Sequence, residues 1–153
     1  MTLHRFILVF TTLVALSLPA VSHAAPTMLV TSEEAAASDA AGGMLIPRMA
    51  PQPGAPEIEL VAPDLQRPIN VPTKIELRFV TNAPAEPKPE SFKALYGAFK
   101  IDITSRILSS AKVTKQGITV SEAQLPAGKH QLVLTLTDTL GREAQQVLAF
   151  TVQ

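Results

Sequence analysis

The chain has 153 residues, and its 13 Lys and Arg balance its 13 Asp and Glu, so its formal net charge is zero at pH 7. The chain therefore has no excess of positive charge that would favour binding to nucleic acid or to an anionic membrane surface. The absence of Cys excludes disulfides, cysteine zinc sites, thiol catalysis and a lipid-modified N-terminal Cys. With 46% hydrophobic and 17% charged residues, the composition suits one globular domain plus a less structured part.

Residues 1–24 are predicted to be a secretory signal peptide. A positively charged start is followed by an apolar run over residues 6–18, which Pro19 ends. Small residues, Ser22 and Ala24, occupy the −3 and −1 positions of a cleavage site. A retained membrane anchor is the alternative, but the apolar run is shorter than the roughly 20 residues that a spanning helix needs. We therefore expect cleavage after Ala24, no stable membrane insertion afterwards, and a periplasmic or secreted protein.

Residues 25–55 are predicted to be a disordered, flexible linker. They are rich in Ala, Pro, Gly and Ser and contain no aromatic residue. Residues 31–43 have the pattern of a short capped helix, but an isolated helix of about ten residues is only marginally stable in water. The prolines between Pro47 and Pro56 favour an extended spacer. The alternative is that the apolar residues of this segment dock on a partner.

From residue 56 to residue 153, short β-like runs alternate with turn signals, a pattern typical of a β-sandwich or a barrel. The clearest run is 73–80, where apolar and charged residues alternate as in a half-buried antiparallel strand. The turn residues at 138–141 predict a hairpin between two long strands. Further strands are expected at 57–62, 91–96, 99–103, 111–114, 117–123, 129–137 and 144–152, and a helical turn at 104–110.

These elements predict an all-β fold, an antiparallel β-sandwich of about 7–8 strands, because each one-sided sheet must bury its apolar face on another sheet. The domain at 56–153 is large enough to bury over half of its unfolded surface without a disulfide. The expected core consists of Ile58, Leu60, Ile75, Leu77, Phe79, Phe92, Phe99, Ile101, Ile118, Val120, Leu132, Leu134, Leu136, Leu148, Phe150 and Val152.

Two segments near the C-terminus carry a more specific pattern. Leu125–Leu132 contains a Gly-x-His corner before an alternating strand, and Thr137–Arg142 contains Asp-x-x-Gly before the final strand. The pattern resembles the end of bacterial immunoglobulin-like domains, and the resemblance covers roughly 56–153. It implies an immunoglobulin-like sandwich in which His130 replaces a corner Tyr whose ring hydrogen-bonds the backbone. Leu132 stands where antibody domains have Cys, so the resemblance implies a disulfide-free version.

Periplasmic copper-carrier proteins offer a weaker similarity in length, export signal and β-sandwich. That group binds metal through an N-terminal His and a late Asp-Gly-His. Here the mature chain would start at Ala25-Pro26, and the late turn over residues 138–141 lacks His. The fold similarity therefore implies no copper site. A periplasmic metal or small-ligand carrier of the copper-handling type remains as the alternative function.

The mature chain offers no convergent set of catalytic or metal-binding residues. Its only His is His130, and no serine lies in a Gly-x-Ser-x-Gly motif, so a structural corner is favoured over a catalytic base. Asp64, Asp102 and Asp138 are each solitary, whereas a calcium site needs several oxygen ligands at once. We expect no enzymatic activity, no cofactor and no bound metal.

Apolar residues on the sandwich surface are the remaining functional lead. If alternate residues of the last two strands face inward, their neighbours face outward and form an apolar ridge. Ordinary β-branched filling of a sheet surface is the alternative explanation. The sequence predicts an exported non-catalytic binding or accessory protein that contacts another exported protein or an envelope component. Its oligomeric state stays open. The candidate partner surface consists of Leu95, Tyr96, Arg106, Val133, Val147 and Ala149.

Overall fold

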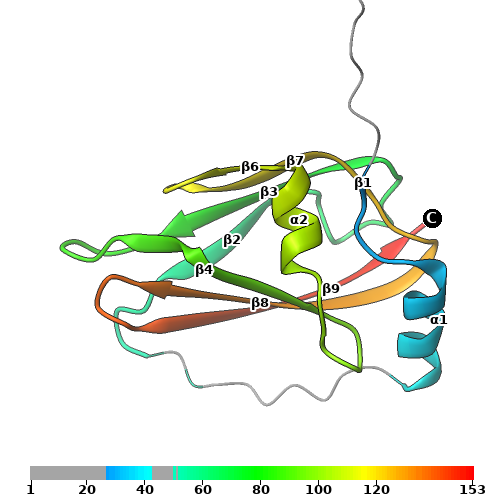
Figure 1. Cartoon of the computed structure of the whole chain (residues 1–153), viewed down its shortest axis with the longest axis horizontal. Coiled ribbons are helices and arrows are strands. Elements are labelled where there is room, and N and C mark those ends of the chain that lie inside the picture. The colour runs from blue at the N-terminus through cyan, green and yellow to red at the C-terminus, as the bar shows by residue number, and fades with distance from the viewer. Residues whose placement is uncertain (1–26, 43–49, 51) are drawn as a thin grey trace, which may run out of the picture.

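The computed structural model describes residues 27–42, 50 and 52–153. The predicted signal peptide lies outside the described residues, as do residues 25–26, 43–49 and 51 of the predicted linker. The described part of the chain is mostly β-structure with two short helices, and its strands form two sheets that face each other (Figure 1). The predicted all-β sandwich is therefore confirmed at the level of two packed, largely antiparallel sheets.

The first sheet has five strands in the order β1-β7-β3-β2, with β6 also paired to β7. Strand β3 (Thr73–Val80) pairs antiparallel with β2 (Glu57–Ala62) on one side and with β7 (Gly117–Gln124) on the other. Strands β6 (Ala111–Thr114) and β1 (Thr27–Met28) share the second edge of β7. Strand β6 runs antiparallel to the first half of β7, and β1 runs parallel to its end.

The second sheet has four strands in the order β5-β4-β8-β9, all antiparallel. These strands are β4 (Pro87–Tyr96), β5 (Ile101–Asp102), β8 (Gly128–Asp138) and β9 (Glu143–Val152). The predicted hairpin joins β8 to β9, whereas β4 begins earlier than predicted, at Pro87, and β5 is shorter. Helix α2 (Thr104–Ser110) lies where a helical turn was predicted and contacts strands of both sheets.

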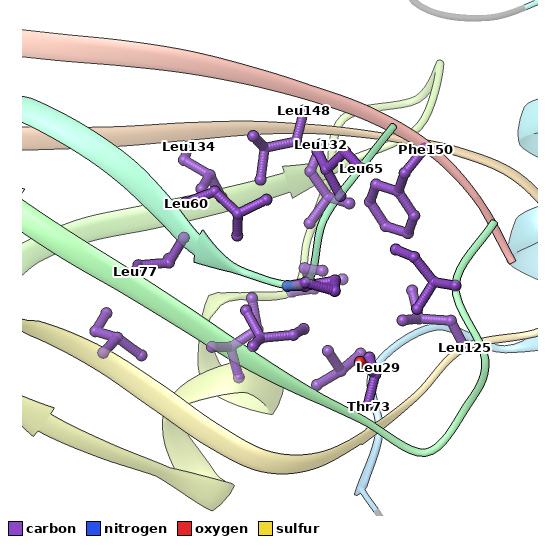
Figure 2. Close-up of a pocket in the computed structure, with 16 residues that line it drawn as sticks. Leu29, Leu60, Leu65, Thr73, Leu77, Leu125, Leu132, Leu134, Leu148 and Phe150 are labelled. Atoms are coloured by element: carbon purple, nitrogen blue, oxygen red, sulfur yellow. The ribbon is translucent and has the colours of Figure 1, made fainter. Parts of the chain in front are cut away.

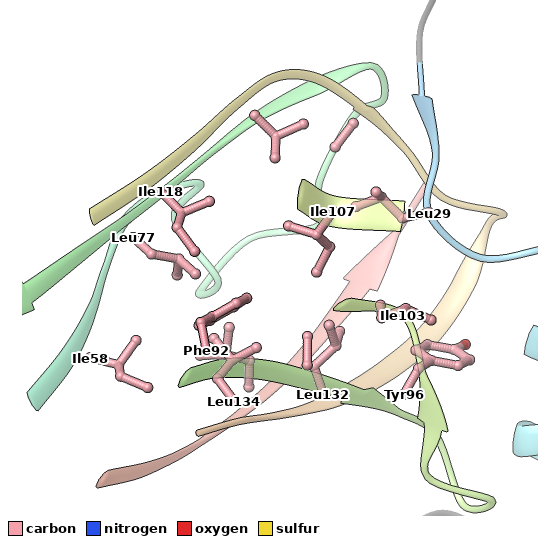
Figure 3. Packing of buried hydrophobic residues seen from close by; sticks show 14 of the residues in the cluster. Leu29, Ile58, Leu77, Phe92, Tyr96, Ile103, Ile107, Ile118, Leu132 and Leu134 are labelled. Carbon is pink, nitrogen blue, oxygen red and sulfur yellow. The ribbon is translucent and has the colours of Figure 1, made fainter. Parts of the chain in front are cut away.

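The two sheets bury one apolar core between them. Figure 3 shows Leu77 and Ile118 of the five-stranded sheet facing Phe92 and Leu134 of the four-stranded sheet. Of the predicted core residues, all but one are buried or packed against this cluster. The exception is Phe99, which is 63% exposed because it lies in the turn between β4 and β5 and not in a strand.

Residues 27–42, here called the N-terminal arm, pack on the sandwich and correct part of the linker prediction. Leu29 and Val30 belong to the core cluster and are 1% and 0% exposed. The Leu29 amide donates to the Gln124 carbonyl at 3.0 Å, which extends the pairing with β7. Tertiary burial therefore stabilises a segment whose short helix would be marginal alone.

The carboxylate of Glu34 holds the N-terminus of helix α1 (Ser32–Ala40) through hydrogen bonds from both Thr31 and Arg106. Thr31 and Glu34 form a capping box, with Glu34 N donating to Thr31 Oγ1 at 3.2 Å and Thr31 N donating to Glu34 Oε2 at 2.9 Å. Arg106 of α2 donates to both oxygens of the same carboxylate, at 2.7 and 2.8 Å. The Arg106 hydrogen bonds are the largest cause that lowers the pKa of Glu34 to about 2. Arg106 thus ties the arm to α2.

The other end of α1 fits closely against the turn that follows β4. Ser38 Oγ accepts a hydrogen bond from the Ala98 amide at 3.0 Å. Gly97 has a φ of +64°, and a Cβ at this position would lie 2.7 Å from the Ser38 Cβ. Both the left-handed backbone and the close approach therefore require glycine at position 97.

We predict that Leu29→Ala lowers the free energy of unfolding by about 3 kcal/mol, because it removes a fully buried side chain and leaves a cavity. Urea denaturation followed by circular dichroism measures this change. Met28→Ala is the matched control in the same arm; Met28 is 52% exposed, so its replacement should change the free energy by less than about 0.5 kcal/mol. Equal effects of the two variants would contradict the integration of the arm into the cooperative fold.

Candidate functional site

Three residues of the predicted partner surface form one row on the outer face of the four-stranded sheet. The register pairs Leu95 of β4 with Val133 of β8, and Val133 with Val147 of β9. Ala149 follows on the same face of β9, opposite Gln131. The structure therefore brings these four apolar residues together on neighbouring strands.

Two residues of the predicted partner surface, Val133 and Tyr96, are buried, so the prediction is wrong at these positions. Val133 lies on the central strand of the row and is only 4% exposed, whereas Leu95 and Val147 are half-buried and Ala149 is exposed. Tyr96 is fully buried, because it follows Leu95 in the strand and so points to the opposite, inner face. The accessible part of the row is therefore narrower than the sequence suggested.

Arg106 does not belong to this row. It lies on helix α2, and its guanidinium is engaged by the carboxylate of Glu34 and, at 3.3 Å, by the carbonyl of Leu29. The hydrogen bonds to the Glu34 carboxylate, followed by its negative charge, raise the pKa of Arg106, although burial acts in the opposite direction. Arg106 therefore anchors the N-terminal arm. The sequence analysis had assigned this residue to the partner surface.

Tyr96 and His130 form a buried polar pair inside the sandwich. The Tyr96 hydroxyl oxygen lies 2.8 Å from His130 Nδ1, and His130 Nε2 lies 2.8 Å from the Pro126 carbonyl oxygen. A carbonyl only accepts hydrogen bonds, so Nε2 carries the proton and Nδ1 accepts from the tyrosine hydroxyl. The Phe150 ring stacks on the imidazole with a centroid separation of 5.5 Å. The bond to Pro126 ties the His130 ring to the backbone four residues upstream.

Burial favours the neutral forms of His130 and Tyr96. It lowers the pKa of His130 below the ordinary value of 6.5, although the Pro126 hydrogen bond and the negative charge of Asp39 act in the opposite direction. Burial also raises the pKa of Tyr96. Both side chains are therefore neutral at neutral pH, and both ring nitrogens of His130 are occupied. This arrangement favours a structural role for His130.

Asp138 is a second buried polar group with a structural role. Its Oδ1 accepts hydrogen bonds from the amides of Leu140 and Arg142, both at 2.9 Å, and its Oδ2 accepts one from Arg142 Nε at 2.7 Å. Burial raises the pKa of Asp138, but the hydrogen bonds from Arg142 and Leu140 outweigh it and hold the pKa below its ordinary value. Asp138 therefore organises the turn between β8 and β9, as the sequence predicted.

The described residues contain no clustered metal ligands. Within this part of the chain, no group of three or more His, Cys, Asp or Glu side chains is placed to hold a metal ion. Asp102 accepts a hydrogen bond from the Thr104 amide at 2.9 Å at the start of α2. Neither α1 nor α2, the helices of the described residues, has the length and apolar character needed to cross a membrane.

Two adjoining spaces in the sandwich were not predicted from the sequence. An apolar cavity of about 50 Å³ lies between the sheets, lined by Leu and Ile side chains of both (Figure 2). Beside it, a groove of about 350 Å³ is bordered by residues 65–68 of the β2–β3 connection, by the start of β8 and by the end of β9. Leu65 and Phe150 line both spaces. No sequence signal indicates these spaces, because their walls come from segments far apart in the chain.

Comparison with known proteins provides no relative from which a function could be transferred. No protein-family model matches the chain, and searches of curated proteins and of solved structures find no match. The geometry of the described residues therefore carries the functional argument.

We predict that the free energy of unfolding decreases as the pH is lowered from 7.5 to 5.5. The pKa of His130 is depressed in the folded state, so the unfolded chain binds a proton more readily in this window. The stabilisation from neutral His130 is fully present above the unfolded pKa of about 6.5 and is lost as the pH falls toward the folded pKa. Urea denaturation at a series of pH values measures the slope.

The control is the double variant His130→Phe with Tyr96→Phe, which removes the titrating ring together with its hydrogen-bond partner. Its free energy of unfolding should change less with pH across the same window, even if its absolute stability is lower. A slope equal to that of the wild-type protein would assign the pH dependence to other groups.

Proposed function

We propose that this protein is an exported, non-catalytic binding or accessory protein whose β-sandwich contacts another envelope or secreted component. The proposal rests on the predicted signal peptide for export and on one structural observation for binding. That observation is the apolar row of Leu95, Val133 and Val147 on an outer sheet face, continued by Ala149. The row includes exposed Ala149 and half-buried Leu95 and Val147 on an outer face, so it is the best candidate for a contact surface.

The residues around the row suit a protein interface. Lys93 and Thr135 form the neighbouring pair on the same face, and Gln145 continues that pair onto β9. An apolar centre with a polar rim is the usual composition of such interfaces. Buried Val133 stabilises the centre of the sheet, while half-buried Val147 and exposed Ala149 supply the accessible area.

The absence of enzymatic activity is part of the proposal. His130, the only His after the predicted cleavage site, is 3% exposed and uses both ring nitrogens in hydrogen bonds within the protein. Asp138 likewise uses both carboxylate oxygens for the hairpin turn. These groups are the ones that acid–base chemistry would need, and in this fold they hold the backbone.

We also propose that the sandwich is immunoglobulin-like. The corner hydrogen bond of His130 and the Asp138 turn between β8 and β9 support this finer description. The alternative function of a metal carrier finds no supporting cluster among the described residues. The alternative function of a small-ligand carrier has support from the groove and the cavity that Phe150 lines.

Site-specific photo-crosslinking in the native host tests the protein contact. A photoreactive amino acid at position 149 should give a discrete crosslinked product, whereas one at position 59 on β2, where the Glu59 side chain is 40% exposed, should not. Val147→Glu should reduce the yield from position 149 by about tenfold, because it places a charge in the apolar centre of the contact. Equal yields from positions 149 and 59, or a yield unaffected by Val147→Glu, would refute the proposed surface.

A further inference from the structure

The groove beside β9 is bordered by a backbone connection that runs from one sheet to the other. The segment that follows β2 crosses to the edge of β9, where Ile69 N donates to the Thr151 carbonyl at 2.8 Å and Gln153 N donates to the Ile69 carbonyl at 3.0 Å. These bonds fix Ile69 as a bridge beside Val152. Residues 65–68, just before the bridge, form one wall of the groove.

The groove combines apolar walls with two cations. Leu65, Phe150 and Pro68 supply apolar surface, and Arg67 and Lys129 supply positive charge from two different segments. Arg67 has one ion-pair partner, Asp64, at 3.9 Å, and the side chains of this pair are 86% and 60% exposed. Such an exposed, long ion pair is weak. Lys129 has no ion-pair partner among the described residues, so both cations are available to an anionic ligand.

The inner wall of the groove leads toward the apolar cavity. Leu65 and Phe150 line both spaces, and Figure 2 shows these two side chains on the same side of the cavity. The cavity offers only about 50 Å³ and is lined by apolar side chains apart from Thr73. Apolar cavities of this kind exclude water and take up apolar groups. A ligand in the groove can therefore place an apolar end against Leu65 and Phe150.

We propose that this groove binds a small amphipathic carboxylate. The carboxylate lies between Arg67 and Lys129, and an unbranched alkyl tail lies along Phe150 toward the cavity. A volume of about 350 Å³ falls at the lower end of small-molecule sites. The guanidinium of Arg67 matches the two oxygens of a carboxylate. This site is distinct from the apolar row proposed for a protein partner, although Ala149 borders both.

Isothermal titration calorimetry of the exported chain with octanoate tests the site, with octan-1-ol and octylammonium as matched ligands of the same tail length. Octanoate should bind with a dissociation constant on the order of 0.1 mM. Octan-1-ol and octylammonium should bind at least about tenfold more weakly, because the cations favour only the carboxylate.

Two variants separate recognition of the charge from that of the tail. Replacing Arg67 and Lys129 together by Gln should weaken octanoate about tenfold or more, and the fold should persist because both side chains lie on the surface. Lys112→Gln, an exposed cation on the distant strand β6, should leave octanoate binding unchanged. Leu65→Trp should weaken the binding of octanoate and octan-1-ol alike, because the larger side chain occupies the space in the groove that both alkyl tails use.

The proposal is overturned if octanoate does not bind, if all three ligands bind equally, or if the Arg67 and Lys129 double variant binds like the wild-type protein. Val147→Glu should leave octanoate binding intact while it disrupts the protein contact. The ligand site and the partner surface therefore succeed or fail independently.

Discussion

The mutual burial of two one-sided sheets is the constraint on which the rest of this structure depends. Without Cys, the chain has no covalent substitute for that burial. The sheets alone leave the side of the core beside β7 and β4 open, and helix α2 and the N-terminal arm close it. Leu29 and Val30 enter the core there, and the Arg106–Glu34 ion pair holds the arm in place.

The same burial decides which polar groups remain available for function. None of the buried side-chain nitrogen and oxygen atoms in the described residues lacks a hydrogen-bond partner. Both ring nitrogens of His130 are hydrogen-bonded, one to Tyr96 and one to Pro126. The Asp138 carboxylate is hydrogen-bonded within its own turn. Because a buried polar group left unpaired is costly, these residues serve the fold. The side chains that remain accessible to a partner or ligand lie on the outer sheet face and in the groove beside β9.

Local periodicity explains how much could be predicted from the sequence. The strands at 57–62, 73–80 and 111–114 have the predicted limits, because alternation and turn residues are properties of neighbouring positions. The period of two also placed Leu95, Val133 and Val147 on one face. It did not reveal that Val133 is buried there, since exposure depends on the strands and side chains on either side. Phe99 was misplaced for a related reason: an apolar residue in a turn has the same sequence signal as one in a strand.

The sequence by itself determined the class of fold, the positions of most strands along the chain and the apolar face of each, because these follow from the alternation of residues that are neighbours in the chain. Only the tertiary structure decided that residues 27–42 join the sandwich, that Arg106 meets Glu34, and that Tyr96 meets His130. It also created the groove of Arg67 and Lys129. Each of these features joins distant segments, and their meeting depends on strand order and register, which local residue patterns do not encode.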